Sequence, residues 1–114
     1  MDKNLHIISS PADYAEKEKI YFEVRKAEGR ILPDEEVRKL PDVSKDNPHA
    51  DEWKIRKDSC GKLKKYIKKN FSNPRILEIG CGNGWLAAQL AEIPGSEVDA
   101  IDLIDDVAQQ VAAL

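Results

Sequence analysis

The sequence predicts an α/β fold in which two parallel strands, joined by a helix, follow a mainly helical N-terminal segment. Two apolar runs, RILEI at 75–79 and EVDAIDL at 97–103, have the length and composition of strands. Between them lie a glycine-rich loop and the segment WLAAQLAEI, whose apolar residues recur at helical spacing. A helix between the strands makes the connection a crossover, which implies a parallel pair and a right-handed connection.

The N-terminal segment, residues 1–74, shows helical patterns separated by a proline-containing connector. SPADYAEKEKIYFEVRKAEG predicts a first helix that Ser10 can cap and Gly29 can end. The following RILPDEEVRKLPDVSKDNP holds three prolines and indicates a connector with at most a short helix. A second helix is expected from about residue 47 to 69. Its apolar stripe consists of Trp53, Cys60, Leu63 and Ile67.

Composition excludes several classes of protein. The chain has 114 residues, of which 41% are hydrophobic and 34% charged. No stretch approaches the roughly 20 apolar residues of a membrane helix, and the N-terminus lacks the apolar core of a secretion signal. The two cysteines, Cys60 and Cys81, fit neither a disulfide framework nor a zinc site. We therefore expect a cytoplasmic protein with reduced thiols, no membrane association and no metal.

Charge is unevenly distributed along the chain. Residues 1–74 carry 17 Lys and Arg against 14 Asp and Glu, whereas residues 75–114 carry one basic residue against seven acidic ones. The glycine loop lies in the acidic part, which disfavours a strongly anionic ligand there. The lysines of KLKKYIKKN indicate a solvated helix face rather than a nucleic-acid-binding stripe, because only Tyr66 is interleaved with them.

The loop ILEIGCGNGWL, residues 76–86, carries the functional signal. A dinucleotide fingerprint needs a third glycine at position 85, where this chain has Trp85. Glu78 stands at the mouth of the loop and would repel a pyrophosphate, but it would favour a cationic ligand. Asp102, 18 residues after Gly84, ends the second strand and could accept hydrogen bonds from ribose hydroxyls. The pattern favours S-adenosylmethionine, which carries an ammonium and a sulfonium but no phosphate.

ILEIGCGNGWLAAQLA followed by VDAIDL resembles the first two motifs of the class I, Rossmann-like S-adenosylmethionine-dependent methyltransferases. The matching positions are Glu78, Gly80, Gly82, Gly84 and Asp102, with Cys81 and Asn83 in the variable places. The resemblance implies that residues 78–84 line the methionine part of the cofactor, that Asp102 holds the ribose and that Leu103 lies against adenine. Arg56, on the second helix, could reach the cofactor carboxylate or could extend from the apolar stripe into solvent.

The resemblance covers about residues 75–114 and implies a sheet of seven strands, of which only the first two are expected here. We therefore expect a truncated Rossmann-like methyltransferase fold, with residues 1–74 as a helical N-terminal extension and residues 75–114 as the start of the cofactor-binding domain. The full-length parent would methylate a small-molecule acceptor, and this chain alone would be inactive, with its catalytic residues elsewhere. Unpaired strand edges predict self-association near residues 75–79 or 97–103.

Two other classes of function remain open from the sequence. One is a fragment of an NAD(P)-dependent oxidoreductase, because Asp102 would suit any adenosine ligand. The other is a non-catalytic interaction domain with a methyltransferase-like fold. For single residues the structural interpretation is favoured: Cys81 as a small loop residue, Trp53 as a core residue, and His6 and His49 as surface residues.

Overall fold

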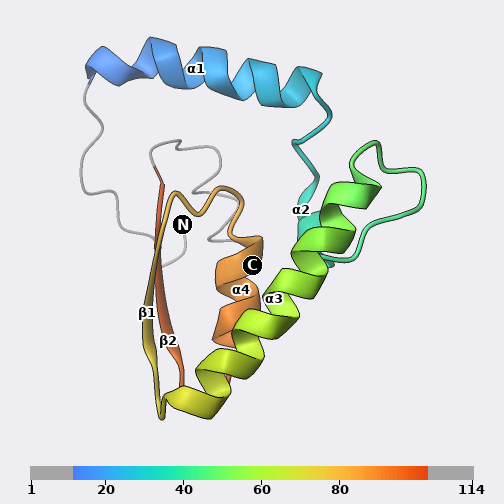
Figure 1. Ribbon diagram of the computed structural model, residues 1–114. Helices are drawn as coiled ribbons and strands as arrows, with labels where there is room; N and C mark the ends of the chain where they lie inside the picture. The colour runs from blue at the N-terminus through green and yellow to red at the C-terminus, as the bar shows by residue number, and fades with distance from the viewer. Residues whose placement is uncertain (1–11, 103–114) are drawn as a thin grey trace.

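The computed structural model describes residues 12–102, with side chains from residue 19 onward, and confirms an α/β arrangement with two parallel strands (Figure 1). The elements in chain order are α1 (Ala12–Ala27), α2 (Asp34–Val37), α3 (Ala50–Asn70), β1 (Arg75–Ile79), α4 (Trp85–Ala91) and β2 (Glu97–Ile101). The strands pair in register from Arg75 with Glu97 to Ile79 with Ile101. The crossover helix α4 connects them as expected. Two further segments with the pattern of regular structure, LHIIS as a candidate strand and DDVAQQVAAL as the start of another helix, lie outside the described residues.

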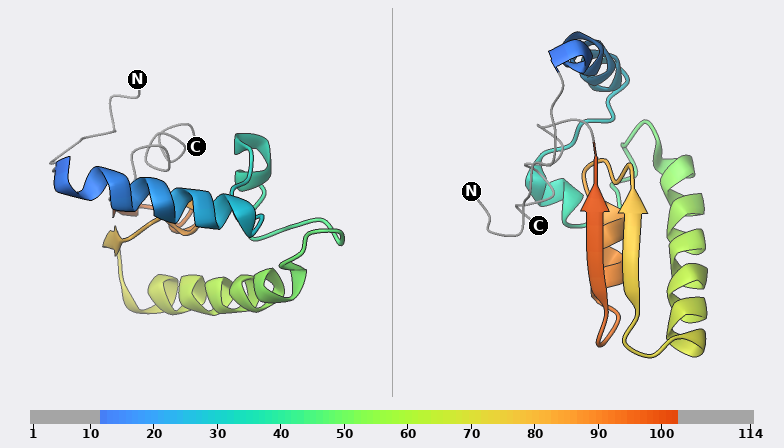
Figure 2. Two further views of the ribbon diagram at one scale, coloured as in Figure 1. Left: turned by 90° about the horizontal axis from the view of Figure 1, so that it is seen from above. Right: turned by 90° about the vertical axis from the view of Figure 1, so that its left-hand side faces the viewer.

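One face of the sheet carries the core beneath α3 and α4, which lie on the same side of the strands (Figures 1 and 2). The cluster consists of Ile67, Leu90 and Ile93, with the partly buried Ile76, Leu86 and Val98 packed against it. Each strand contributes the residues of one alternating face, because successive side chains of a strand point to opposite sides. Across the helix pair, Lys64 Nζ donates to Glu92 Oε2 at 3.0 Å. Helix α3 is therefore anchored to the same core as the crossover helix.

The opposite face of the sheet is exposed. Leu77 and Ile79 of β1 are 60% and 75% exposed, and Ile101 of β2 is 40% exposed. An apolar run such as RILEI suits a buried strand, but Arg75, Leu77 and Ile79 are exposed, so that expectation is wrong for one face of β1. The run is apolar on both faces, which suits a sheet covered on both sides, but the described residues cover only one.

Helix α1 lies beyond the carboxyl ends of both strands (Figure 2). It ends at Gly29 as expected, because φ is +71° there and the N–H of Arg30 donates to the carbonyl of Arg25 at 2.9 Å. The connector then forms the single turn α2 and places Val37 and Leu40 among the most buried side chains. Gln89 Nε2 donates to the carbonyl of Leu40 at 3.1 Å, which ties the connector to α4. The chain thus returns from α1 to the sheet beside the glycine loop.

Candidate functional site

The glycine loop turns sharply between β1 and α4. Gly80, Gly82 and Gly84 have φ of +73°, +56° and +83°, a region that residues with a Cβ rarely occupy. The N–H groups of Gly80 and Cys81 donate to the carbonyl of Ile101 at 2.8 and 3.0 Å, so the loop is held against the end of β2. A Cβ added at Gly80 or Gly82 would meet no atom within 4 Å. The loop therefore presents bare backbone to open space.

That open space belongs to a cavity of about 320 Å³ at the carboxyl ends of the strands. The cavity lies between the glycine loop, the end of α1 with the connector after it, and the start of α3. The predicted site residues that line it are Arg56, Glu78, Gly80, Cys81, Gly82, Asn83 and Asp102. Gly84 is buried at the start of α4 and does not line it, and Leu103 lies outside the described residues. The structure thus brings the two predicted motifs to one cavity.

Asp102 faces the loop from the end of β2. Its Oδ2 accepts a hydrogen bond from the N–H of Gly82 at 2.8 Å. A carboxylate of the chain itself therefore occupies a position where a loop amide could otherwise bind an external anion.

Glu78 is the most unusual polar group of the cavity. The N–H of Ala87 acts on its carboxyl group as a backbone donor, but the buried Oε2 has no hydrogen-bond partner among the described residues. Burial raises the pKa of this carboxyl above its ordinary value, the Ala87 N–H opposes that rise, and the charge of Asp102 adds to it. A buried acceptor without a donor is costly, and a carboxylate oxygen is best satisfied by a charged donor.

Cys81 is a buried free thiol between these two carboxylates. Burial, followed by the charges of Asp102 and Glu78, raises its pKa to about 11. At neutral pH the thiol therefore stays protonated and is a poor nucleophile. This agrees with its interpretation as a small loop residue, and the charge contributions mark the loop as a site of negative potential.

The opposite wall of the cavity was not predicted from the sequence. It includes Tyr21 and Arg25 of α1, Arg30 after it, and Asn47 and His49 before α3. These residues come from helix ends and the connector, and no short motif joins them. In the sequence these residues share only two properties: they precede the loop by 30 or more residues, and they carry polar groups. Neither property distinguishes them from ordinary surface residues.

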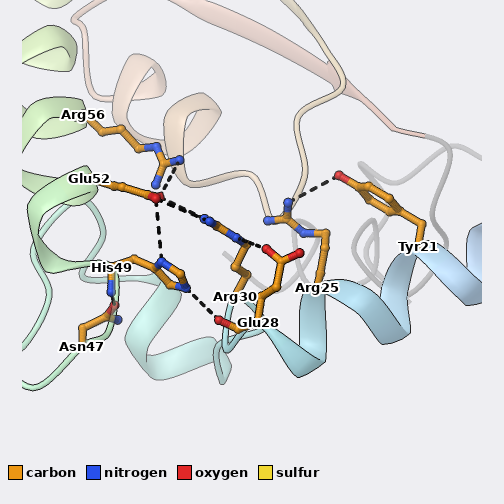
Figure 3. Close-up of polar contacts among 8 residues, drawn as sticks. All are labelled: Tyr21, Arg25, Glu28, Arg30, Asn47, His49, Glu52 and Arg56. Atoms are coloured by element: carbon orange, nitrogen blue, oxygen red, sulfur yellow. Dashed lines mark hydrogen bonds and ion pairs between the residues drawn. The ribbon is translucent and has the colours of Figure 1, made fainter.

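A cluster around Glu52 joins the segment that follows α1 to the start of α3 along this wall (Figure 3). Glu52 Oε2 lies 3.0 Å from Arg30 Nη1 and 3.4 Å from Arg56 Nη2, and Arg30 Nε also contacts Glu28 Oε2 at 2.6 Å. The hydrogen bond from Arg30 is the main cause that lowers the pKa of Glu52, and the bonds to Glu52 and Glu28 raise the pKa of Arg30. These contacts hold the segment that follows α1 against the start of α3.

His49 also lines this wall, so it has contacts that its description as a surface histidine did not include. It is partly buried, and its Nε2 lies 2.7 Å from the carbonyl oxygen of Glu28. Its Nδ1 lies 3.8 Å from Glu52 Oε1. His6 lies outside the described residues.

Both tryptophans border the cavity. Trp53 and Trp85 pack edge to face with ring centroids 5.1 Å apart, and the Arg56 guanidinium lies 4.7 Å from the centre of the Trp53 ring. Trp53 is partly buried and lines the cavity, so it is more than the core residue that the sequence suggested. Trp85 stands where a dinucleotide fingerprint has its third glycine. It is the first residue of α4, and its side chain lines the cavity.

Comparisons with known protein families, with curated proteins and with solved structures find no match. None of the helices in the described part of the chain combines the length and apolarity that a membrane crossing requires. The cavity is therefore the feature of the molecule that bears on its function.

Proposed function

We propose that the chain binds S-adenosylmethionine in this cavity and serves as the cofactor-binding part of a methyltransferase with a small-molecule acceptor. The observation that carries the proposal is the buried Oε2 of Glu78, which lacks a donor in the part of the chain that the structure describes. The ammonium of the cofactor's methionine part would supply that donor. A small rotation of the carboxyl group is required, because Oε2 is screened from solvent although the Glu78 side chain lines the cavity.

The electrostatics of the loop support a cationic ligand over a dinucleotide. Glu78 and Asp102 both line the cavity, and Asp102 already accepts the N–H of Gly82. A pyrophosphate would have to displace that carboxylate from the loop amide and lie beside two negative charges. A sulfonium or ammonium would be attracted by both, and the attraction is strengthened where water is displaced. This argument disfavours the NAD(P) alternative.

The residues of the chain would divide the binding between them. The open backbone at Gly80 and Gly82 would allow the cofactor to approach closely, and Asp102 would accept hydrogen bonds from the ribose. Arg56 would bind the cofactor carboxylate through guanidinium donors that its contact with Glu52 leaves available. When bound, the cofactor supplies a methyl group on a positively charged sulfur. Methyl transfer then depends on placing the acceptor in line with that group, so that positioning provides much of the catalysis.

Calorimetric titration of the full chain with S-adenosylhomocysteine and with NADH tests the proposal. We expect saturable binding of S-adenosylhomocysteine and none of NADH. Asp102→Ala should weaken the binding by about 1.5–3 kcal/mol, the range for a hydrogen bond to a charged group. Glu97→Gln, an exposed acid away from the cavity, is the matched control and should bind as wild type. Binding of NADH in preference to S-adenosylhomocysteine would reject the function.

Two further features belong to the proposal. Both cysteines are buried free thiols, which fits the reducing conditions of the cytoplasm.

The exposed side chains of Leu77 and Ile79 provide the apolar surface through which copies of the chain would self-associate. Sedimentation at increasing protein concentration should show association that Ile79→Asp reduces. A wild-type chain that stays monomeric would argue against self-association without affecting the cofactor assignment.

A further inference from the structure

Helix α1 adds a charge of opposite sign to the cavity. Tyr21 and Arg25, on the C-terminal half of α1, line the same cavity as Glu78 and Asp102. Arg25 Nη1 donates to the hydroxyl of Tyr21 at 3.4 Å, and the guanidinium lies 5.7 Å from the centre of the Tyr21 ring. Figure 3 shows this pair on α1, beside the Glu52 cluster. The cavity therefore has carboxylates at the loop and a guanidinium on the opposite wall.

Three arginines line the cavity, but they are not equivalent. Arg30 is held by Glu28 and Glu52, and Arg56 by Glu52. Arg25, by contrast, forms no ion pair with any carboxylate of the described residues, and its one side-chain hydrogen bond goes to the neutral hydroxyl of Tyr21. Among the described residues its charge therefore has no acidic partner, and most of its five N–H donors make no contact with them.

We propose that Arg25 binds the carboxylate of an acidic methyl acceptor. The inference rests on the proposed function, which places the cationic cofactor against the loop, at Glu78 and Asp102. The space between that cofactor and α1 is then the place for the acceptor, and Arg25 stands on its outer wall. A planar guanidinium matches a carboxylate with two parallel hydrogen bonds. The rings of Tyr21 and Trp53, which also line the cavity, offer apolar surface for the body of the acceptor.

The test titrates benzoate into the full chain saturated with S-adenosylhomocysteine and follows tryptophan fluorescence. Both tryptophans of the chain line the cavity, so the signal reports on this site. Benzamide, which has the same ring without the charge, is the ligand control. We expect benzoate to saturate the signal and benzamide to bind at least about tenfold more weakly, as loss of a charge-assisted hydrogen bond requires.

The variants separate Arg25 from general effects of charge. Arg25→Ala should weaken benzoate at least about tenfold, Arg25→Lys should be intermediate, and S-adenosylhomocysteine affinity should stay within about twofold in both. Lys26→Ala removes the neighbouring charge, which does not line the cavity, and should bind benzoate as wild type. Thermal unfolding of each variant shows whether α1 is still folded. Lys26→Ala and Arg25→Lys keep the test interpretable if Arg25→Ala is destabilised.

Three results would overturn the inference: no saturable benzoate binding to the loaded chain, equal benzoate affinity in wild type and Arg25→Ala, or a tenfold loss of S-adenosylhomocysteine affinity in Arg25→Ala. The last would assign Arg25 to the cofactor instead. Failure of the proposed function is a different result, because wild type itself would then not bind S-adenosylhomocysteine. In that case benzoate binding to the unloaded chain that depends on Arg25 would still show an anion site on α1.

Discussion

Glu52 and Glu78 are carboxylates in neighbouring parts of the molecule with opposite surroundings. Glu52, on α3, contacts the cationic side chains of Arg30 and Arg56, and hydrogen bonding lowers its pKa. Glu78, on β1, has one backbone donor and a buried oxygen with no partner in the described part of the chain, and burial raises its pKa. Glu52 is paired with neighbouring arginines, whereas Glu78 Oε2 has no donor among the described residues. On the proposed function, this difference separates a carboxylate that stabilises the fold from one that binds the cofactor.

The two carboxylates also differ in what they do for stability. A lowered pKa means that the folded chain favours the ionised form, so Glu52 stabilises the fold when it is charged. A raised pKa means that the folded chain favours the protonated form, so an ionised Glu78 costs stability. A residue that is unfavourable in the free protein but present at the mouth of a cavity is typical of a binding site.

The largest expected effect comes from Glu78→Gln. Because the variant removes the charged partner of the ligand ammonium, S-adenosylhomocysteine should bind about ten- to hundredfold more weakly. The ligand-free variant should nevertheless unfold at a higher temperature than wild type, because a buried neutral amide replaces a desolvated charge and can still accept the N–H of Ala87. Calorimetry and thermal unfolding measure the two effects. A variant that is less stable and binds normally would reverse the roles assigned here.

The pH dependence should separate the two carboxylates next. The stabilisation from Glu52 is present above its ordinary pKa of 4.5 and is lost as pH falls through its lowered value. The contribution of Glu78 has the opposite sign: it is present below 4.5 and is lost as pH rises through its raised value. Unfolding temperatures should therefore fall less on raising the pH above 4.5 in Glu78→Gln than in wild type. Cofactor binding should weaken as the pH is lowered through the raised pKa of Glu78 towards 4.5, because Glu78 becomes protonated there.

Glu52→Gln should have the smallest effect on binding. Glu52 does not line the cavity and acts only by positioning Arg30 and Arg56, so S-adenosylhomocysteine affinity should fall by no more than about threefold. The unfolding temperature should drop, because the ion pairs that hold Arg30, after α1, to α3 lose their central charge. High salt should reduce that difference between variant and wild type, since these ion pairs are partly exposed. Loss of cofactor binding comparable to that of Glu78→Gln would remove the distinction between the two residues.

The parts of the site that the sequence predicts are local. Glu78, the three glycines and Asp102 belong to two strand ends and a loop within about 25 residues, and parallel strands must bring their carboxyl ends to one edge. The bounds of β1 match the prediction and those of α3 differ from it by at most three residues, because both elements have proline or glycine near their ends. The sequence predicts the second strand over 97–103, but β2 ends at Ile101 and Asp102 lies just after it. The apolar run of β1 also predicted a strand, but not that Leu77 and Ile79 would be exposed.

The opposite wall could not be predicted, because it depends on contacts between distant residues. Arg25 and Tyr21 reach the loop only because the chain turns at Gly29 and the connector packs against α4 through Leu40. In sequence, Arg25 is one basic residue among many, and nothing distinguishes it from Lys26. Only the fold shows that one of the two lines the cavity and lacks an acidic partner among the described residues.

The most direct test of the central claim is a comparison of two ligands on two proteins. S-adenosylhomocysteine carries the ammonium proposed to meet Glu78, and 5′-methylthioadenosine has the same nucleoside without it. Calorimetric titration of wild type and Glu78→Gln with both ligands gives four affinities. If the carboxylate contacts the ammonium, the variant loses more affinity for S-adenosylhomocysteine than for methylthioadenosine, and that difference measures the contact. We expect the variant to lose about ten- to hundredfold in affinity for S-adenosylhomocysteine and less than about threefold for methylthioadenosine. Equal losses for the two ligands would contradict this expectation, because the carboxylate would then not be the partner of the ammonium.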